Sequence, residues 1–228
     1  MAKTEKTRKQ LLNEPDQFIT FSGKLIAFGR SHAKTLLICA GVAVALLLTA
    51  ATIRQISERN EKRASEMVEA AVTKYAAALE DTDPKTAYER VQTDFNDIFD
   101  RYGSQETAKV ARILYGDISY KGADTDTAIA MYTQALEDFE HSAALRNIIL
   151  SGLGHAYMVK SEYPQAMGYF EMIVSGSQPD MKSDALFNLA WLYETTGEEA
   201  KSKATYQQLL AEFPDTMYGE LVKEKISS

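Results

Sequence analysis

The sequence predicts an all-α protein in which one N-terminal transmembrane helix is followed by an α-solenoid, a row of stacked helix pairs. Three observations support this class: an uncharged run of nineteen residues, no strand-like alternation after that run, and a helix-pair pattern that recurs with periods of 38 and 36 residues. The 228 residues suffice for a leader, one span and a soluble domain of about 165 residues, which is large enough to bury its own core.

The uncharged run TLLICAGVAVALLLTAATI (35–53) predicts the membrane-spanning helix. At about 1.5 Å per residue it reaches nearly 30 Å, about the thickness of the hydrocarbon core of a bilayer. A cleaved signal peptide is the alternative, with Thr49-Ala50-Ala51 as an acceptable cleavage site. Both the leader and the run are longer than those of usual signal peptides, which favours an uncleaved signal-anchor.

Charge divides the chain at this span. Residues 1–63 carry 11 Lys and Arg against 5 Asp and Glu, a net charge of +6, whereas residues 64–228 carry 14 against 27, a net charge of −13. An acidic domain repels nucleic acid, so we expect no nucleic-acid partner. Lysines and arginines flank the span on both sides, so charge alone leaves its orientation open. The single cysteine, Cys39, lies inside the span, and the soluble domain therefore has no disulfide.

The leader ends in an amphipathic pattern. Apolar side chains recur at spacings of three and four residues from Phe18 through Phe21 and Leu25 to Phe28, which predicts a helix that could lie flat on the membrane before the span. The alternative is a plain helical extension of the span that is broken near Gly29. Within the span, Gly41 and Ala45 are spaced for close helix contact, so the chain could form a homo-oligomer or dock on another membrane protein.

After the span, residues 54–103 are expected to form a helical linker and a degenerate first helix pair. Asp83-Pro84 is a typical helix start, and the helix that follows it should end near Gly103. Residues 104–228 are expected to contain three helix-pair repeats and a C-terminal capping helix over 218–226.

The repeats are seen by superposing segments that begin at Leu114, Leu153 and Leu189. Their first helices share a small residue, Gly116, Gly154 or Ala190. Their second helices carry a small residue and then an aromatic four residues later: Ala128 and Tyr132, Ala166 and Phe170, and Ser202 and Tyr206. This pattern resembles the tetratricopeptide repeat, a 34-residue helix–turn–helix unit, although Ser119 and Ser202 depart from it and the periods are longer. A non-repetitive helical bundle is the alternative.

No residue set points to catalysis. The three histidines, His32, His141 and His155, have no partner at metal-ligand spacing, and phosphate loops and nucleophile elbows are absent from the sequence. We therefore expect no enzyme, no catalytic or metal residues and no cofactor.

The tetratricopeptide resemblance implies a protein-binding groove lined by the first helix of each unit. Position 9 of the three units reads Asp117, His155 and Trp191, so the Asn and Lys clamp for a C-terminal carboxylate is missing. The alternative is that the aromatic members are buried in the core. The candidate groove residues are Ile113, Asp117, Tyr120, Lys121, Ser151, His155, Met158, Val159, Phe187, Trp191 and Glu194.

The whole layout resembles the ancillary SecYEG translocon subunit family. A leader that ends in FITFSGKLIAFGRSHAKTL (18–36) meets one span, an Ala- and Glu-rich helix and tetratricopeptide repeats. The resemblance implies a single-pass protein of the bacterial inner membrane, with leader 1–34 in the cytosol and the repeats in the periplasm. Its partners would be translocon subunits, exported clients or periplasmic chaperones, and it would assist the handover of exported chains. The segment FPDTMYGELVKEKI (213–226) is also similar to repeat ends in proteins that organise envelope assembly or cell division, which is the alternative function.

Overall fold

The computed structural model describes residues 17–227 apart from residue 180, and within that range every regular element is an α-helix. The chain separates into two compact units, residues 1–58 and 59–228. The first unit contains α2 (Gln17–Ser31) and the beginning of α3 (Ala33–Asp81). The second contains the rest of α3 and the helices α4 (Pro84–Tyr102), α5 (Glu106–Lys121), α6 (Thr125–Asp138), α7 (Ala143–Val159), α8 (Tyr163–Val174), α9 (Lys182–Thr195), α10 (Glu199–Glu212) and α11 (Gly219–Ser227).

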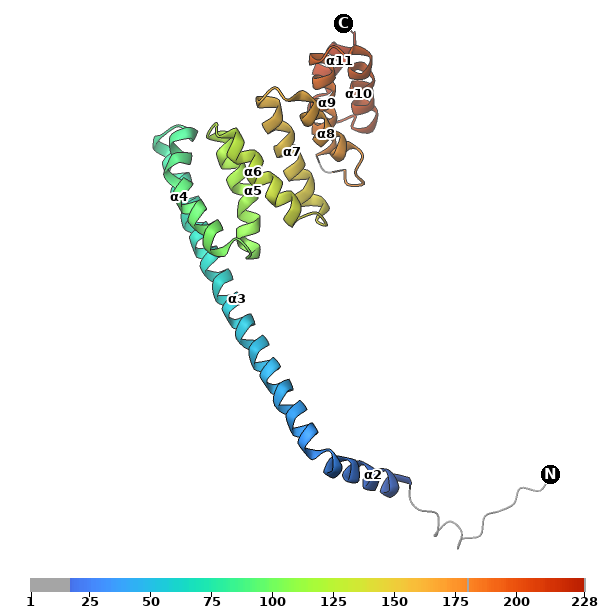
Figure 1. The fold of residues 1–228 in the computed structure, drawn as a ribbon. Coiled ribbons are helices and arrows are strands. Elements are labelled where there is room, and N and C mark those ends of the chain that lie inside the picture. The colour runs from blue at the N-terminus through green and yellow to red at the C-terminus, as the bar shows by residue number, and fades with distance from the viewer. Residues whose placement is uncertain (1–16, 180, 228) are drawn as a thin grey trace, which may run out of the picture. The chain divides into compact units, whose positions relative to one another are not determined.

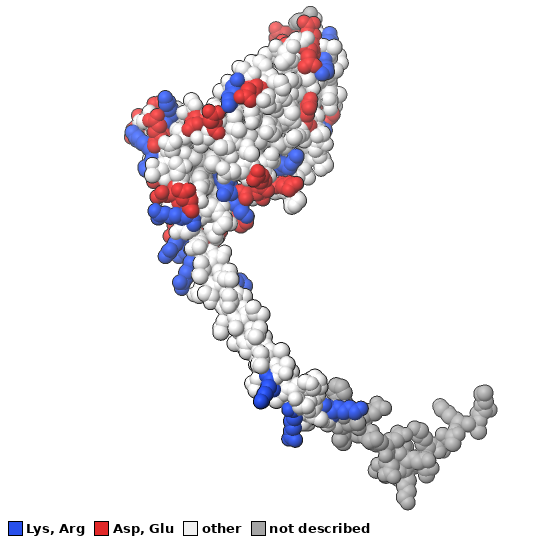
Figure 2. All heavy atoms as spheres, in the orientation of Figure 1, with Lys and Arg blue, Asp and Glu red and all other residues white. Residues whose placement is uncertain are grey.

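In the first unit, α3 contains a stretch that is long and apolar enough to cross a membrane. Its mean hydropathy over 18 residues is 2.6, and none of this stretch is buried in the structure. Figure 2 shows it as an uncharged length of helix. The predicted apolar run therefore forms one helix that no part of the described structure covers.

The second unit is a succession of antiparallel helix pairs (Figure 1). The pairs α5/α6, α7/α8 and α9/α10 correspond to the three predicted repeats, and each helix packs mainly on its neighbours in the sequence. The part of α3 from Met67 onward packs with α4 and α5, and α11 covers the end of the last pair. The hydrophobic core accordingly forms four successive clusters, each joining consecutive helices.

Local sequence explains where these helices begin and turn. The Asp83 carboxylate accepts hydrogen bonds from the backbone N–H groups of Lys85 (3.0 Å) and Thr86 (3.2 Å), and Pro84 occupies the first helical position of α4. The turns inside the three repeats each contain one residue with a left-handed backbone, Ala123 (φ 63°), Ser161 (φ 59°) and Gly197 (φ 79°). These residues are separated by the two periods of the sequence pattern, so the repeats share one backbone geometry.

In each repeat, a small residue of the first helix packs against an aromatic ring of the second helix. A Cβ atom on Gly116 would lie 2.8 Å from the Tyr132 ring, and one on Gly154 would lie 2.6 Å from the Phe170 ring. Both distances are too short for a side chain, so only glycine allows these helices to approach so closely. Ala190 and Tyr206 are buried together at the same spacing in the third repeat.

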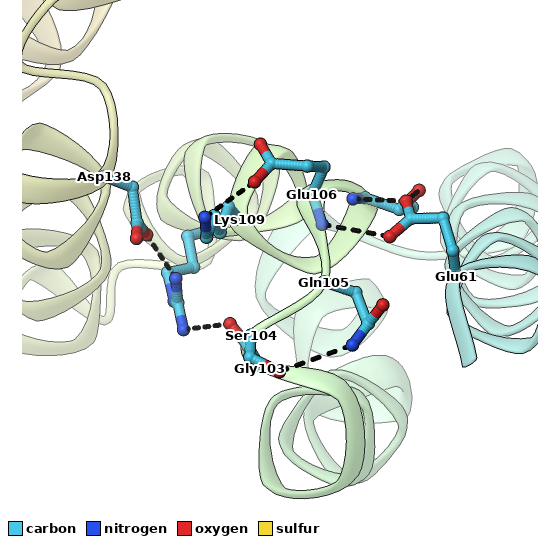
Figure 3. A network of polar contacts seen from close by, with 9 residues as sticks. Glu61, Gly103, Ser104, Gln105, Glu106, Lys109 and Asp138 are labelled. Carbon is cyan, nitrogen blue, oxygen red and sulfur yellow. Dashed lines mark hydrogen bonds and ion pairs between the residues drawn. The ribbon is translucent and has the colours of Figure 1, made fainter. Parts of the chain in front are cut away.

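The helix α5 is capped by a residue from far away in the sequence. Its own N-cap residue, Gln105, makes no side-chain capping bond. Instead the carboxylate of Glu61, on α3, accepts hydrogen bonds from the backbone N–H groups of Glu106 (3.0 Å) and Thr107 (2.8 Å) and from the Thr107 hydroxyl (Figure 3). The bond from the Thr107 hydroxyl is the main reason that the pKa of Glu61 is lowered. Glu61 thus joins the α3 helix to the first repeat.

Replacing Glu61 with glutamine is expected to reduce the free energy of unfolding of the second unit by about 1 kcal/mol at pH 7, as for the loss of other helix caps. Because the pKa of Glu61 is lowered in the folded state, its contribution is complete above the unfolded-state pKa of about 4.3 and is lost as the pH falls through the lower folded-state value. Urea titrations of both proteins at a series of pH values measure this. A difference that stays constant down to pH 3, or an equal loss in the exposed control Glu66→Gln, would contradict the prediction.

Candidate protein-binding groove

An open groove with a cavity of about 470 Å³ lies between α5 and α7. These are the first helices of two consecutive repeats. The walls of the groove are mostly apolar, and the polar groups on them come from one carboxylate, one imidazole and a few hydroxyl groups. The lining residues are Val110, Ile113, Leu114, Asp117, Tyr120, Tyr132, Leu145, Ile148, Ser151, Gly152 and His155.

Helical periodicity brings these side chains to one face. Val110, Ile113, Leu114 and Asp117 follow the i, i+3, i+4, i+7 spacing of one helix face. Val110 and Ile148, on the two facing helices, keep 48% and 45% of their surface exposed. Large aliphatic side chains that remain this exposed in a concave surface are typical of a binding groove rather than of a core.

Two polar side chains of the groove, Asp117 and His155, are each held by a neighbour. The Asp117 carboxylate accepts a hydrogen bond from the Lys121 ammonium at 2.7 Å. His155 packs edge-on against Phe170, with ring centroids 5.4 Å apart. Burial lowers the pKa of His155, and the carboxylate of Asp184 opposes this only in part. The imidazole is therefore neutral at pH 7, so His155 adds no positive charge to the mostly apolar groove.

The structure brings five of the predicted groove residues into this cavity, namely Ile113, Asp117, Tyr120, Ser151 and His155. Lys121 lies beside it, paired with Asp117. Met158 and Val159 lie beyond it on α7. Met158 packs against the core cluster of α8 and α9, and Val159 is exposed.

The three predicted residues on α9 lie outside the groove between α5 and α7. Phe187 stacks on Tyr218 next to α11, with ring centroids 4.1 Å apart. Trp191 contacts Tyr163 edge-on at 6.5 Å. Glu194 pairs with Lys225 at 2.7 Å and borders a separate polar pocket of about 400 Å³. These side chains are engaged by α8 and α11.

Several lining residues are not among the predicted groove residues, including Val110, Leu114, Leu145 and Ile148. A signal for two of them was present, because Val110 and Ile148 each precede a predicted groove residue, Ile113 and Ser151, by one helical turn. Among the described residues, no group of three or more His, Cys, Asp or Glu side chains is placed to hold a metal ion.

Comparison with known proteins gives the class of the fold. The family model described as the tetratricopeptide repeat matches residues 184–216, the third predicted repeat. Tetratricopeptide repeats generally act as protein-binding scaffolds rather than as catalytic domains. The chain therefore carries a tetratricopeptide repeat, and the prediction of an all-α, tetratricopeptide-like solenoid is confirmed.

Two solved structures have a similar fold. One is the crystal structure of a tetratricopeptide repeat protein from Parabacteroides merdae, with a TM-score of 0.57 and 13% identity over 71% of this chain and 59% of that chain. The other comes from a functional characterisation of Pseudomonas aeruginosa pilF, with a TM-score of 0.52 and 13% identity over 72% of this chain and 68% of that one. The chain thus spans less than two thirds of the Parabacteroides protein. No curated protein matches it in sequence.

Proposed function

We propose that this chain is a non-enzymatic scaffold that is tethered to a membrane by α3 and binds segments of other proteins in the groove between α5 and α7. The observation that carries the proposal is the groove itself, a concave and mostly apolar cavity of about 470 Å³ on a tetratricopeptide-like fold. Such a cavity accepts apolar side chains of a bound segment.

The exposed apolar stretch of α3 supports the proposed tether. A helix with this composition is unfavourable in water and favourable in a bilayer. Holding the repeats at a membrane raises their effective concentration for partners in the same bilayer, so that weak contacts in the groove suffice for binding.

More specifically, we propose an ancillary role at the bacterial secretion translocon, with the repeats in the periplasm receiving exported chains or passing them to chaperones. Its support is the resemblance of the sequence layout, from the leader motif at 18–36 through the span to the repeats. A groove that is apolar rather than charged suits clients that vary in sequence and expose hydrophobic segments.

The groove is tested by photo-crosslinking from single positions in living cells. A photoreactive amino acid at Val110 or Ile148 is expected to crosslink to proteins several-fold more efficiently than one at Met172, which is equally exposed but lies outside the groove on α8. Equal crosslinking from all three positions would contradict the groove as the binding site.

The identity of the crosslinked proteins tests the proposed role at the translocon. Translocon subunits or exported chains among the products from Ile148 support the translocon role. Crosslinks to envelope-assembly or cell-division proteins instead would contradict the translocon role and support the alternative function, the organisation of envelope assembly or cell division.

A further inference from the structure

The helix α2 carries large apolar side chains that no other part of the described structure covers. Leu25, Ile26 and Phe28 keep 60%, 59% and 56% of their surface exposed. They belong to the apolar pattern that starts at Phe18 in the sequence. Exposed apolar side chains gathered on one face of a helix mark an interaction surface.

The charges of α2 lie along the borders of this apolar face. A rotation of about 100° per residue places Lys24 just beyond one edge of the apolar arc and Arg30 just beyond the other. Ala27 lies on the opposite, polar face. The helix contains no Asp or Glu. Long cations at both borders of an apolar face can extend to lipid headgroups while the apolar side chains enter the acyl region.

A break of one residue, His32, divides α2 from the helix that contains the span. The helix α2 ends at Ser31, and α3 begins at Ala33, two residues before the uncharged run. At this junction the Ser31 hydroxyl donates a hydrogen bond to the Phe28 carbonyl (3.0 Å), and the Phe28 and His32 rings stack with centroids 4.5 Å apart. Side-chain bonds to backbone carbonyls of this kind accompany bends in helices. Figure 1 shows α2 and α3 as two helices.

We infer that α2 is an interfacial helix that lies along anionic lipid headgroups in the leaflet where the apolar run of α3 begins, with Leu25 and Phe28 in the lipid and Lys24 and Arg30 at the headgroups. The inference rests on the proposed membrane tether, because α3 is what brings α2 to a bilayer. A continuous connection to the span holds the helix at the surface, so that its modest apolar area suffices for binding. Anionic lipid is the occupant because every charge on α2 is positive.

Spin labels on the full-length chain in vesicles test this inference. The native thiol is removed with Cys39→Ala, and one cysteine at a time is introduced at Leu25, at Ala27 or at Leu47 in the apolar run. The vesicles contain phosphatidylcholine and phosphatidylglycerol in equal parts. Collision rates of each label with oxygen, which concentrates in lipid, and with a water-soluble nickel complex report its environment. The label at residue 25 is expected to be lipid-exposed, and the label at 27 water-exposed.

The labels at residues 25, 27 and 47 together distinguish the ways in which the inference could fail. A label at 47 that is exposed to water would overturn the membrane tether itself. With residue 47 in lipid, water exposure at both 25 and 27 would overturn the interfacial helix alone. Lipid exposure at both would show that α2 continues the span. Spin–spin broadening at 25 would show that a second copy covers the face instead of lipid.

The charges are tested with the double variant Lys24→Gln and Arg30→Gln. Each cation near an anionic surface contributes roughly fivefold to binding, so the ratio of lipid-bound to free α2, read from the two components of the residue-25 spectrum, should fall about 25-fold. The matched control Lys62→Gln with Arg63→Gln removes two charges beyond the other end of the run and should leave the ratio unchanged. An unchanged ratio in the α2 variant would overturn the assignment to anionic lipid.

Discussion

Replacing Phe170 with alanine is expected to lower the free energy of unfolding of the repeats by about 3–5 kcal/mol. Phe170 is fully buried, and its ring fills the space that Gly154 leaves on the facing helix. Losing the ring leaves a cavity that the backbone at Gly154 cannot fill. Urea titration of a fragment with residues 59–228, followed by helicity, measures the loss.

The control is Met172→Ala on the same helix, where the side chain is exposed and a change of less than about 0.5 kcal/mol is expected. Equal effects of the two substitutions would contradict the packing described for the second repeat. The complementary substitution Gly154→Ala should also destabilise, since its Cβ would meet the Phe170 ring. That penalty should shrink in a Phe170→Leu background, because the smaller side chain makes room.

Replacing Arg112 with methionine is expected to cost about 3 kcal/mol, because it leaves a largely buried carboxylate without its cation. The Arg112 guanidinium binds the Asp138 carboxylate and donates a hydrogen bond to the Gly103 carbonyl at 2.8 Å. The side chains of Arg112 and Asp138 are only 14% and 20% exposed. The pair therefore ties the turn before α5 to the end of α6.

The double variant Arg112→Met with Asp138→Leu is expected to recover most of this loss, because it removes both charges and fills the site with apolar atoms. Lys121→Met provides the contrast. It breaks the exposed pair with Asp117 and should cost less than about 1 kcal/mol. The same urea titration compares the three proteins, and an Arg112→Met loss as small as that of Lys121→Met would show that the buried pair is unimportant.

Local patterns predicted most of the fold. The Asp83-Pro84 helix start depends on neighbours within a few residues, and α4 begins at Pro84. The apolar run is read from consecutive residues in the same way, and it lies within the single helix α3. The repeat pattern identified the small residues and the aromatic residues, and the structure shows that they pack in pairs, with Gly116 facing Tyr132 and Gly154 facing Phe170. A repeat makes long-range packing readable from sequence, because the same contact recurs at a fixed spacing.

The binding surface was less predictable, because contacts outside the repeat pattern decide which inner positions stay open. Phe187 is covered because Tyr218, 31 residues later in the sequence, stacks on it, and Lys225 engages Glu194. Nothing in the spacing of α9 itself indicates these partners. The cap on α5 was missed for the same reason, since Glu61 reads locally as one more charge on a solvated helix.

The cap by Glu61 has a practical consequence for where fragments of the second unit should begin. By composition, the stretch between the apolar run and Ala64 resembles a dispensable spacer, and a truncation there would look harmless. A fragment that starts at Ala64 keeps every buried side chain of the repeats yet lacks the carboxylate that holds the first turn of α5. Crystallisation and ligand screening should therefore start from fragments that begin at or before Arg59, because the wall of the groove that α5 provides depends on an atom outside the repeats.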